Sequence, residues 1–302
     1  MSHNTSTIGP IRCVTIACAD VQTMIDTYHL FLGYQLVEHG KLTPAHAQIW
    51  GLPNMGGRRY ALMLPGGEGI TAIRFVESKA PTGYVAFKHM GWNAAEFMVQ
   101  DTDGIAAKLE HSPFKIIGPP ADLSFSDKIR AMQALGPAGE SIYLTSFKEK
   151  LPEFDTPDPK HYVDRVFIVI LGGESCAQIN DFYHQHFSVP KAPVVPGVIS
   201  VISNAHGLPS DTPHELAALA LKGQSFIEAD HMPAGTLPRV ALEGELPPAI
   251  SMISFEVDRL PESEYLRWLA PPAVLTGEPY QGRRAGVCLG SAGEWIELIE
   301  RS

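Results

Sequence analysis

Several features that define common protein classes are missing from this sequence of 302 residues. No apolar run approaches the roughly 20 residues that a membrane-spanning helix needs. The polar segment 1–7 lacks the basic and apolar regions of a secretory signal. The four cysteines have no CxxC spacing, which argues against a zinc knuckle or a disulfide framework; they are Cys13, Cys18, Cys176 and Cys288. We therefore expect a soluble, cytoplasmic protein.

An excess of basic residues is also missing. Lysine and arginine number 23 against 33 aspartates and glutamates, which gives a formal net charge of −10. Nucleic-acid binding usually requires a basic face, so a polyanionic partner is not expected. The glycine-rich residues 66–69 separate two expected strands, so a hairpin turn explains them better than a phosphate loop. The expected partner is a small molecule, with no nucleic acid and no membrane.

The sequence does contain a repeated phrase. Residues 289–294 read LGSAGE, and residues 135–140 read LGPAGE. The strands that follow place Glu297 where the earlier copy has Tyr143, an offset of 297 − 143 = 154 residues. A segment rich in proline and acid, residues 151–159, separates the two copies. This pattern predicts two domains of ordinary size, residues 1–150 and 151–302.

Hydrophobic periodicity predicts one order of elements four times: strand, helix, then three strands. The first unit is expected within residues 11–76 and the second within 94–147. The third is expected as a strand at 163–170, a helix at 176–187, a strand at 194–203, a short helix at 214–221 and a strand at 224–229. The fourth is expected as a strand at 251–258, a short helix at 262–269, strands at 273–276 and 284–289, and the closing strand within 289–300.

This arrangement resembles the vicinal oxygen chelate superfamily, which includes glyoxalase I, the extradiol dioxygenases and the bleomycin-binding proteins. Residues 14–34 look like its opening strand and helix, ending in a Y-x-x-x-L-G-Y pattern. Residues 254–258 resemble its F-x-V-x-D motif, and residues 293–298 its closing G-N-x-I-E-L strand. The resemblance implies an α+β fold in which four βαβββ units pair into two half-open mixed-sheet barrels.

In that superfamily, histidines on opening strands and glutamates on closing strands converge on a metal ion. Here the matching opening-strand positions hold Cys13, Ala94, Arg165 and Met252. The closing-strand positions hold Arg74, Tyr143, Glu228 and Glu297. The resemblance therefore implies a degenerate metal site in which Glu228 and Glu297 are the remaining candidate ligands. A divalent ion such as iron, manganese or zinc, and no metal at all, both stay open.

Glu297 is the central candidate residue, and its role has three readings. It is a buried carboxylate paired with Arg165, a metal ligand, or a catalytic base. The candidate catalytic residues are Glu297, Arg165 and His206, because a carboxylate, a guanidinium and an imidazole supply a base, an oxyanion clamp and an auxiliary acid. The candidate substrate-binding residues are Arg74, Tyr143, Phe255 and Trp295, of which the aromatic ones offer stacking surfaces.

Two functions follow from the resemblance and remain open. The first is a glyoxalase- or dioxygenase-like enzyme that acts on a small oxygenated organic metabolite as a lyase, isomerase or divergent ring-cleaving oxygenase. The alternative is a metal-free protein that binds or sequesters a small molecule, which the loss of every opening-strand histidine favours. Because the chain already contains four units, it is expected to be a monomer or a homodimer.

Overall fold

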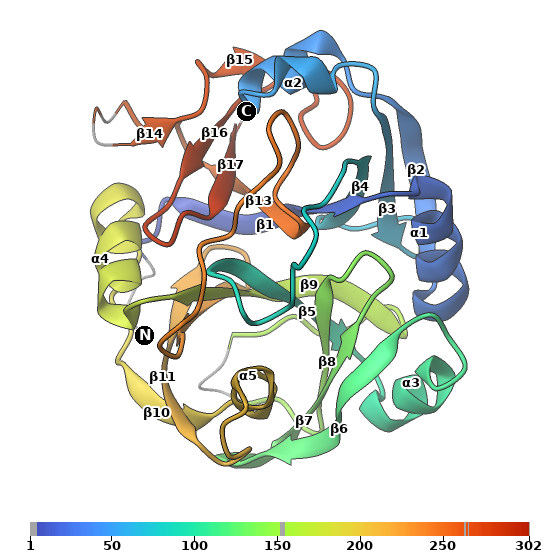
Figure 1. The fold of residues 1–302 in the computed structure, drawn as a ribbon, viewed down its shortest axis with the longest axis vertical. Helices are drawn as coiled ribbons and strands as arrows, with labels where there is room; N and C mark the ends of the chain where they lie inside the picture. The colour runs from blue at the N-terminus through green and yellow to red at the C-terminus, as the bar shows by residue number, and fades with distance from the viewer. Residues whose placement is uncertain (1–4, 152–154, 263, 265, 302) are drawn as a thin grey trace.

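The computed structural model describes residues 5–151, 155–262, 264 and 266–301. Within them the chain forms two mixed sheets that lie one above the other in Figure 1. Sheet 1 has nine strands in the order β14-β16-β17-β13-β1-β4-β3-β2, with β15 paired to β16. Sheet 2 has eight strands in the order β10-β11-β12-β9-β5-β8-β7-β6. No helix in the described part of the chain is long and apolar enough to cross a membrane.

Four units supply these strands, as the sequence predicted. Unit 1 contains β1 (Ile8–Cys18), α1 (Val21–Thr27), η1 (Tyr28–Leu32), β2 (Tyr34–Lys41), α2 (Pro44–Ile49), η2 (Pro53–Met55), β3 (Arg59–Pro65) and β4 (Ala72–Glu77). Unit 2 contains β5 (Gly91–Val99), α3 (Thr102–Leu109), β6 (Lys115–Leu123), β7 (Ser126–Leu135) and β8 (Ser141–Phe147). Unit 3 contains β9 (Val163–Gly173), α4 (Cys176–Phe187), β10 (Val195–Val198), α5 (Ser200–His206), β11 (Pro213–Leu221) and β12 (Ser225–His231). Unit 4 contains β13 (Ala249–Val257), β14 (Arg267–Trp268), β15 (Ala273–Val274), β16 (Arg284–Leu289) and β17 (Trp295–Glu300).

The pairing of the units differs from the expected one. Sheet 1 joins units 1 and 4 through antiparallel β1 and β13, and sheet 2 joins units 2 and 3 through β5 and β9. The expected boundary near residue 150 therefore separates two units that share a sheet. The opening strands of all four units are apolar and similar in sequence, so the sequence does not specify which opening strand pairs with which. Consequently the closing strands β4 and β17 belong to one sheet, and β8 and β12 to the other.

Two elements of unit 3 are also corrected. The segment 214–221, expected as a helix, is strand β11, and the second part of the strand expected at 194–203 is helix α5. The alanine- and leucine-rich β11 has helical propensity, but hydrogen bonds to β10 and β12 on both sides hold it extended. In unit 4 the expected helix at 262–269 overlaps the short strand β14, and residues 263 and 265 lie outside the described residues.

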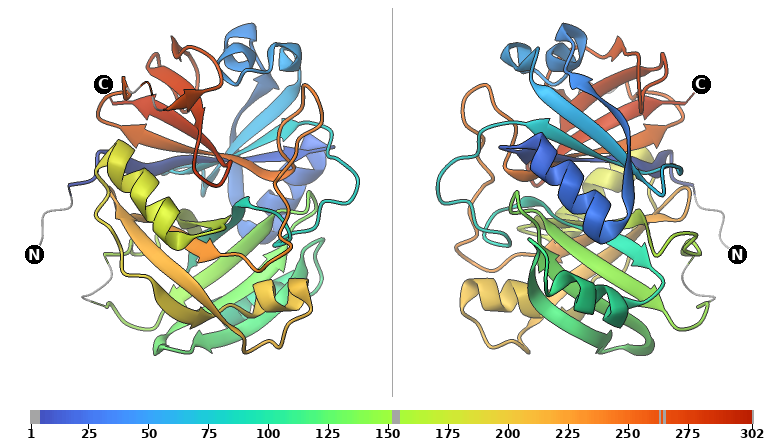
Figure 2. Two further views of the ribbon diagram at one scale, coloured as in Figure 1. Left: turned by 60° about the vertical axis from the view of Figure 1, so that its left-hand side comes forward. Right: turned by 90° about the vertical axis from the view of Figure 1, so that its right-hand side faces the viewer.

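The two sheets pack back to back, with α1 and α4 covering opposite ends of the layer between them (Figure 2). One large apolar cluster draws side chains from both sheets and from these helices. Trp92 of β5 contacts Phe255 of β13 across the layer, with ring centroids 6.0 Å apart. Because the apolar backs of the sheets bury each other, each sheet turns its concave face outward. Those two concave faces are where polar side chains collect.

The repeated LGxAGE phrase builds a hydrogen-bonded loop twice. In each copy the glutamate folds back over the first glycine, where an added Cβ on Gly136 or Gly290 would lie 1.9 Å from the carboxylate. The second glycine has a positive φ, 77° at Gly139 and 76° at Gly293, a conformation that favours glycine. The geometry of the loop therefore requires both glycines of the LGxAGE sequence in each half of the chain.

Each folded glutamate also ties the two sheets together. Tyr28 of unit 1 donates to Glu140 at 3.0 Å, and Tyr183 of unit 3 donates to Glu294 at 3.1 Å. The loop N–H groups of Ala138 and Ala292 donate to the same carboxylates. Each bond joins a helix packed on one sheet to the loop that leads into the other. We call these two contacts the Tyr–Glu clamps.

The clamps predict a pH-dependent stability. Burial raises the pKa of Glu140 and of Glu294 to about 7, although their hydrogen bonds act in the opposite direction. The folded protein therefore holds two protons that the unfolded chain releases at lower pH, so stability falls as pH rises from about 4.5 to 7. A Glu140→Gln/Glu294→Gln variant is expected to lose up to about 1.4 kcal/mol per pH unit of that slope for each group. Denaturant unfolding at pH 5, 6 and 7 measures it, and equal slopes in variant and parent would contradict the assignment.

Candidate functional site

The concave faces of the two sheets have equivalent construction and different contents. Helix α2 covers the face of sheet 1 and helix α5 that of sheet 2 (Figure 1). In sheet 1 the closing strands β4 and β17 contribute Arg74 and Glu297. In sheet 2 the closing strands β8 and β12 contribute Tyr143 and Glu228. The four closing-strand positions derived from the sequence are thus paired in space two by two.

In sheet 1 Arg74 and Glu297 form a buried ion pair. Their Nη2 and Oε2 atoms are 2.9 Å apart, and the two side chains are 2% and 0% exposed. Trp50, at the end of α2, donates its indole N–H to Oε1 of Glu297 at 2.9 Å. The Tyr280 hydroxyl donates to the same oxygen at 2.7 Å. Ser254 of β13 donates to Oε2. Both carboxylate oxygens are therefore fully used.

The guanidinium is equally saturated. Arg74 donates through Nε and Nη2 to the Thr15 hydroxyl at 3.0 and 2.8 Å, and through Nη1 to Tyr280 at 2.6 Å. Its Cζ atom lies 4.8 Å from the ring centroid of Trp50, a cation–π distance. We call these six residues together the sealed network: Arg74, Glu297, Thr15, Trp50, Ser254 and Tyr280. In it, each guanidinium nitrogen and each carboxylate oxygen has a hydrogen-bond partner.

Electrostatics keep both groups of the pair charged. Burial alone lowers the pKa of Arg74, but Glu297 and Tyr280 outweigh it, so the pKa rises above its ordinary value. Burial alone raises the pKa of Glu297, and Arg74 with the hydrogen bonds from Ser254, Tyr280 and Trp50 lowers it below the ordinary value. A metal ion does not fit here, because Arg74 supplies the compensating positive charge at Oε2 and Trp50, Tyr280 and Ser254 occupy the remaining acceptor positions of the carboxylate.

The sealed network predicts a strong coupling between its two charges. Replacing Arg74 with Met leaves a buried carboxylate unpaired and is expected to lower the free energy of unfolding by about 3–5 kcal/mol. Adding Glu297→Gln removes that unpaired charge, so the double variant should be more stable than Arg74→Met alone. A double-mutant cycle by denaturant unfolding measures the coupling. Additive losses would show that the pair contributes no interaction of its own.

In sheet 2 three carboxyl groups converge without a counter-ion. Glu96 of β5, Glu228 of β12 and Asp230 of β12 all belong to the concave face. Glu96 pairs with Tyr143 in the register of β5 and β8, and Glu228 and Asp230 lie two residues apart on β12. All three acids raise the pKa of the Tyr143 hydroxyl. Glu96 is 8%, Asp230 0% and Tyr143 7% exposed, while Glu228 is half-buried. We call Glu96, Glu228 and Asp230 the acid cluster.

One member of the acid cluster, Asp230, is unsatisfied as well as buried. Neither carboxyl oxygen of Asp230 has a hydrogen-bond partner within the described chain, and the Tyr143 hydroxyl has none either. Burial raises the pKa of Glu96 to about 8, aided by Glu228, and raises the pKa of Glu228 to about 7. Burial and the two neighbouring glutamates raise the pKa of Asp230 as well. Unpaired buried polar atoms are rare in proteins and commonly mark a ligand or functional site.

An apolar lid covers this cluster in part. Val201 and Ile202 of α5 pack with Phe87 and Tyr143, and Phe87 comes from the segment that precedes β5. His206, at the end of α5, contacts the Phe87 carbonyl through Nε2 at 2.9 Å. Half-buried apolar side chains border the same cluster: Ile117, Leu135, Ile168, Ile199 and Ala205. The face is therefore apolar, partly open and acidic at its centre.

The residues predicted to act together are divided between the two faces. Glu297 lies in sheet 1, whereas Glu228 and His206 lie with sheet 2. The expected partner of Glu297, Arg165, instead donates to the carbonyls of Gly223 and Gln224 at 2.9 and 3.0 Å. Arg74 takes its place because pairing of units 1 and 4 brings β4 into the same sheet as β17.

Two expected substrate-binding aromatics lie elsewhere. Phe255 is 0% exposed in the layer between the sheets, against Trp92, so it faces away from both concave faces. Trp295 is half-buried at the start of β17, and its carbonyl accepts the Trp92 indole N–H at 2.8 Å. Of the four expected substrate-binding residues, Tyr143 lies beside the acid cluster.

Sequence reasoning missed Glu96. It assigned the inward position of β5 to Ala94, two residues earlier on the same face. The signal was present, because Glu96 is the one charged residue in the run 91–99. Asp230 lies two residues from Glu228 on β12 and therefore shares its face.

A metal ion does not fit the acid cluster as it is arranged. In the part of the chain that the structure describes, no group of three or more His, Cys, Asp or Glu side chains is positioned to hold a metal ion. The donor set consists of oxygen atoms alone, without the imidazoles that the resemblance implies.

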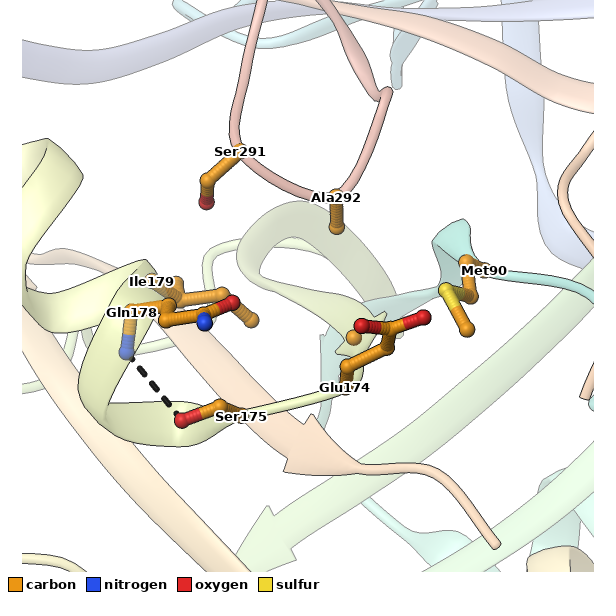
Figure 3. Close-up of a pocket in the computed structure, with 8 residues that line it drawn as sticks. Met90, Glu174, Ser175, Gln178, Ile179, Ser291 and Ala292 are labelled. Carbon is orange, nitrogen blue, oxygen red and sulfur yellow. Dashed lines mark hydrogen bonds between the residues drawn. The ribbon is translucent and has the colours of Figure 1, made fainter. Parts of the chain in front are cut away.

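A cavity of about 180 Å³ lies apart from both concave faces (Figure 3). It is bordered by the start of α4 and by the loop before β17, with Glu174 and Gln178 extending between them. Ser175 caps α4 by accepting from the Gln178 N–H at 3.3 Å. None of the unpartnered buried atoms found among the described residues belongs to this cavity. The acid cluster is therefore the stronger candidate site.

Comparison with known proteins identifies the fold. No protein-family model and no curated protein matches the sequence. Glyoxalase I from Zea mays superposes with a TM-score of 0.65, at 13% identity over 96% of this chain and 92% of that chain. A variant of that enzyme gives 0.66, at 12% identity over 99% and 95%. A Bacillus subtilis protein named as a candidate dioxygenase gives 0.62, at 13% identity over 98% and 86%.

These likenesses confirm the fold that the sequence resemblance implied. The chain has the glyoxalase-like and dioxygenase-like fold of paired βαβββ units, and the solved structures match along nearly its whole length. At identities of 12 to 13% they carry no information on activity. The function must therefore be argued from the side chains of this protein.

Proposed function

We propose that this protein is an enzyme that catalyses proton transfer on a small oxygenated organic metabolite, as a lyase or an isomerase, at the concave face of sheet 2. The observation that carries the proposal is the acid cluster with its unpartnered Tyr143 hydroxyl. Buried polar groups without partners cost free energy, so they are retained where a ligand completes them.

The chemistry follows from the titration of the cluster. A general base is most effective when its pKa lies near the working pH, and the pKa values of Glu228 and Glu96 are raised to about 7 and about 8. At neutral pH the cluster holds both ionised and protonated carboxyl groups. An ionised carboxylate accepts a proton from the substrate carbon next to a carbonyl. A protonated neighbour donates its own proton to the adjacent substrate atom, so the number of protons on the cluster is unchanged.

Tyr143 stabilises the charge that this transfer creates. Burial and the three neighbouring acids raise its pKa, so the hydroxyl keeps its proton at neutral pH. With no partner in the protein, that O–H is available to donate to an oxygen on which negative charge develops. The apolar lid formed by Val201, Ile202 and Phe87 limits water around the reacting group.

The second candidate function is binding without turnover. The sealed network favours this function, because the concave face of sheet 1 is occupied by a buried, hydrogen-bonded ion pair and offers no reactive group. If the sheet 2 face has likewise lost catalytic activity, it would bind a ligand without converting it. The two functions differ in one measurable property, the exchange of ligand protons with solvent.

Solvent exchange tests the proposed function directly. A panel of small hydroxy- and oxo-carbonyl compounds is incubated with the protein in D₂O, and deuterium uptake at carbon is followed by NMR. Glu228→Gln and Glu96→Gln are each expected to slow uptake by about 10²–10⁴-fold, the usual contribution of a positioned acid or base. Glu140→Gln is the matched control, since its pKa is also raised to about 7 but it lies in a clamp. Uptake that survives both cluster variants, or binding with no uptake, refutes catalysis here.

The pH profile gives a separate test. A base must be ionised to act, so the exchange rate should rise as pH increases from about 6 to 8, through the raised pKa values of Glu228 and Glu96. In Glu228→Gln the lower of these two transitions should disappear. A rate that is flat across this range in the parent protein would remove both glutamates from the proton transfer.

A further inference from the structure

The acid cluster is the one place on either concave face where several carboxyl groups face no positive charge. Among the described residues, no salt bridge involves Glu96, Glu228 or Asp230, and no cation appears among the causes that shift their pKa values. In sheet 1, by contrast, a single carboxylate is matched by one guanidinium. The two faces are built alike, so the missing charge is a property of this face.

The cations of sheet 2 are committed elsewhere. Arg165 of β9 donates to two backbone carbonyls in the turn between β11 and β12. Arg130 of β7 pairs with Asp103 and Asp122. Neither compensates the acid cluster. A ligand that enters this face therefore meets three carboxyl groups, and a cationic ligand brings a charge that no salt bridge among the described residues supplies.

The surroundings of the cluster suit an organic cation. Tyr143 and Phe87 lie with ring centroids 6.4 Å apart, and Phe226 is half-buried on the face that carries Glu228 and Asp230. Aromatic faces attract ammonium groups, and half-buried Ile168 and Ile199 offer contact to a short carbon chain.

We infer that the substrate of this face is a small amine, whose ammonium group binds among Glu96, Glu228 and Asp230 while its oxygen accepts from the Tyr143 hydroxyl. This assignment rests on the proposed function for the reaction, and it adds the substrate class. It excludes carboxylates and phosphates, because their negative charge opposes all three acids. It also leaves one carboxyl free to move a proton while the others hold the cation.

Binding of a cation changes the protonation of the cluster. An ammonium group favours the ionised form of each carboxyl that it contacts, so protons leave the protein when the amine binds. Affinity for an amine should therefore rise between pH 6 and 8, opposite to the trend for an anion. The titratable groups on this face are the three acids, the Tyr143 hydroxyl and two histidines. His206 lies on α5, and His214 lies on β11 with its Nε2 hydrogen-bonded to Ser203 of α5 at 2.8 Å.

Three stable probes of similar size and different charge test the inference. Ethanolamine carries an ammonium group, ethylene glycol is neutral and glycolate carries a carboxylate. In NMR titrations of the intact protein at pH 7.5, ethanolamine is expected to bind at least about tenfold more tightly than ethylene glycol, and glycolate more weakly than either. Equal affinities, or tighter binding of glycolate, overturn the inference.

Variants assign the binding to the cluster. Glu228→Gln and Asp230→Asn keep the shape of each side chain and remove its charge, and each should lower ethanolamine affinity by about tenfold or more. Glu140→Gln, a buried glutamate outside the face, should leave it unchanged. Thermal unfolding of each variant checks that it is folded. Loss of binding in Glu140→Gln alone would place the amine elsewhere.

Two further arms separate the inference from its alternatives. Manganese chloride is titrated alone, and tight binding that ethanolamine does not displace would make the cluster a metal site and overturn the amine assignment. Solvent exchange on carbon, measured as above, reports on catalysis independently. Amine binding without solvent exchange supports the amine assignment and refutes the proposed catalysis. Solvent exchange on neutral carbonyl compounds, with no preference for the amine, supports catalysis and refutes the amine assignment.

Discussion

The ion pair between Arg74 and Glu297 decides which of the two concave faces can bind a ligand. It occupies the position where the closing strands of sheet 1 meet, and hydrogen bonds from Trp50, Tyr280 and Ser254 complete the carboxylate. With both charges satisfied and less than 3% exposed, nothing remains there to bind an ion or polarise a substrate. The concave face of sheet 1 is a polar core.

The same fold leaves sheet 2 with the opposite balance. Its closing strands bring Tyr143 and Glu228 together, and neighbouring positions add Glu96 and Asp230, so acids accumulate where sheet 1 has a matched pair. Placing three carboxyl groups together on one face with no salt bridge among the described residues works against folding, and burial raises the pKa of each. One duplicated scaffold thus carries a stabilised face and a strained one, and strain of this kind is typical of sites that act on ligands.

Much of the fold could be predicted from sequence, because it depends on local pattern. The four units, helix α4 and the inward direction of Glu297 all follow from periodicity within short segments. The pairing of units did not follow, since β1, β5, β9 and β13 are alike in composition and the choice among them depends on tertiary packing. Because the pairing of units was unknown, the sequence suggested Arg165 as the partner of Glu297, whereas the structure pairs Glu297 with Arg74. Glu96 was missed for a local reason, a shift of two residues along β5.

The Tyr–Glu clamps explain why the halves of the sequence look duplicated although neither half forms its own sheet. Each clamp lies within one half of the chain, Tyr28 with Glu140 and Tyr183 with Glu294, yet each connects sheet 1 to sheet 2. The repeated LGxAGE loop is therefore preserved by a contact between the sheets, independent of what the concave faces contain. Because the clamps and the apolar layer hold the scaffold together, the concave faces are free to differ. In this protein one face pairs its carboxylate with an arginine, and the other carries three carboxyl groups with no salt bridge among the described residues.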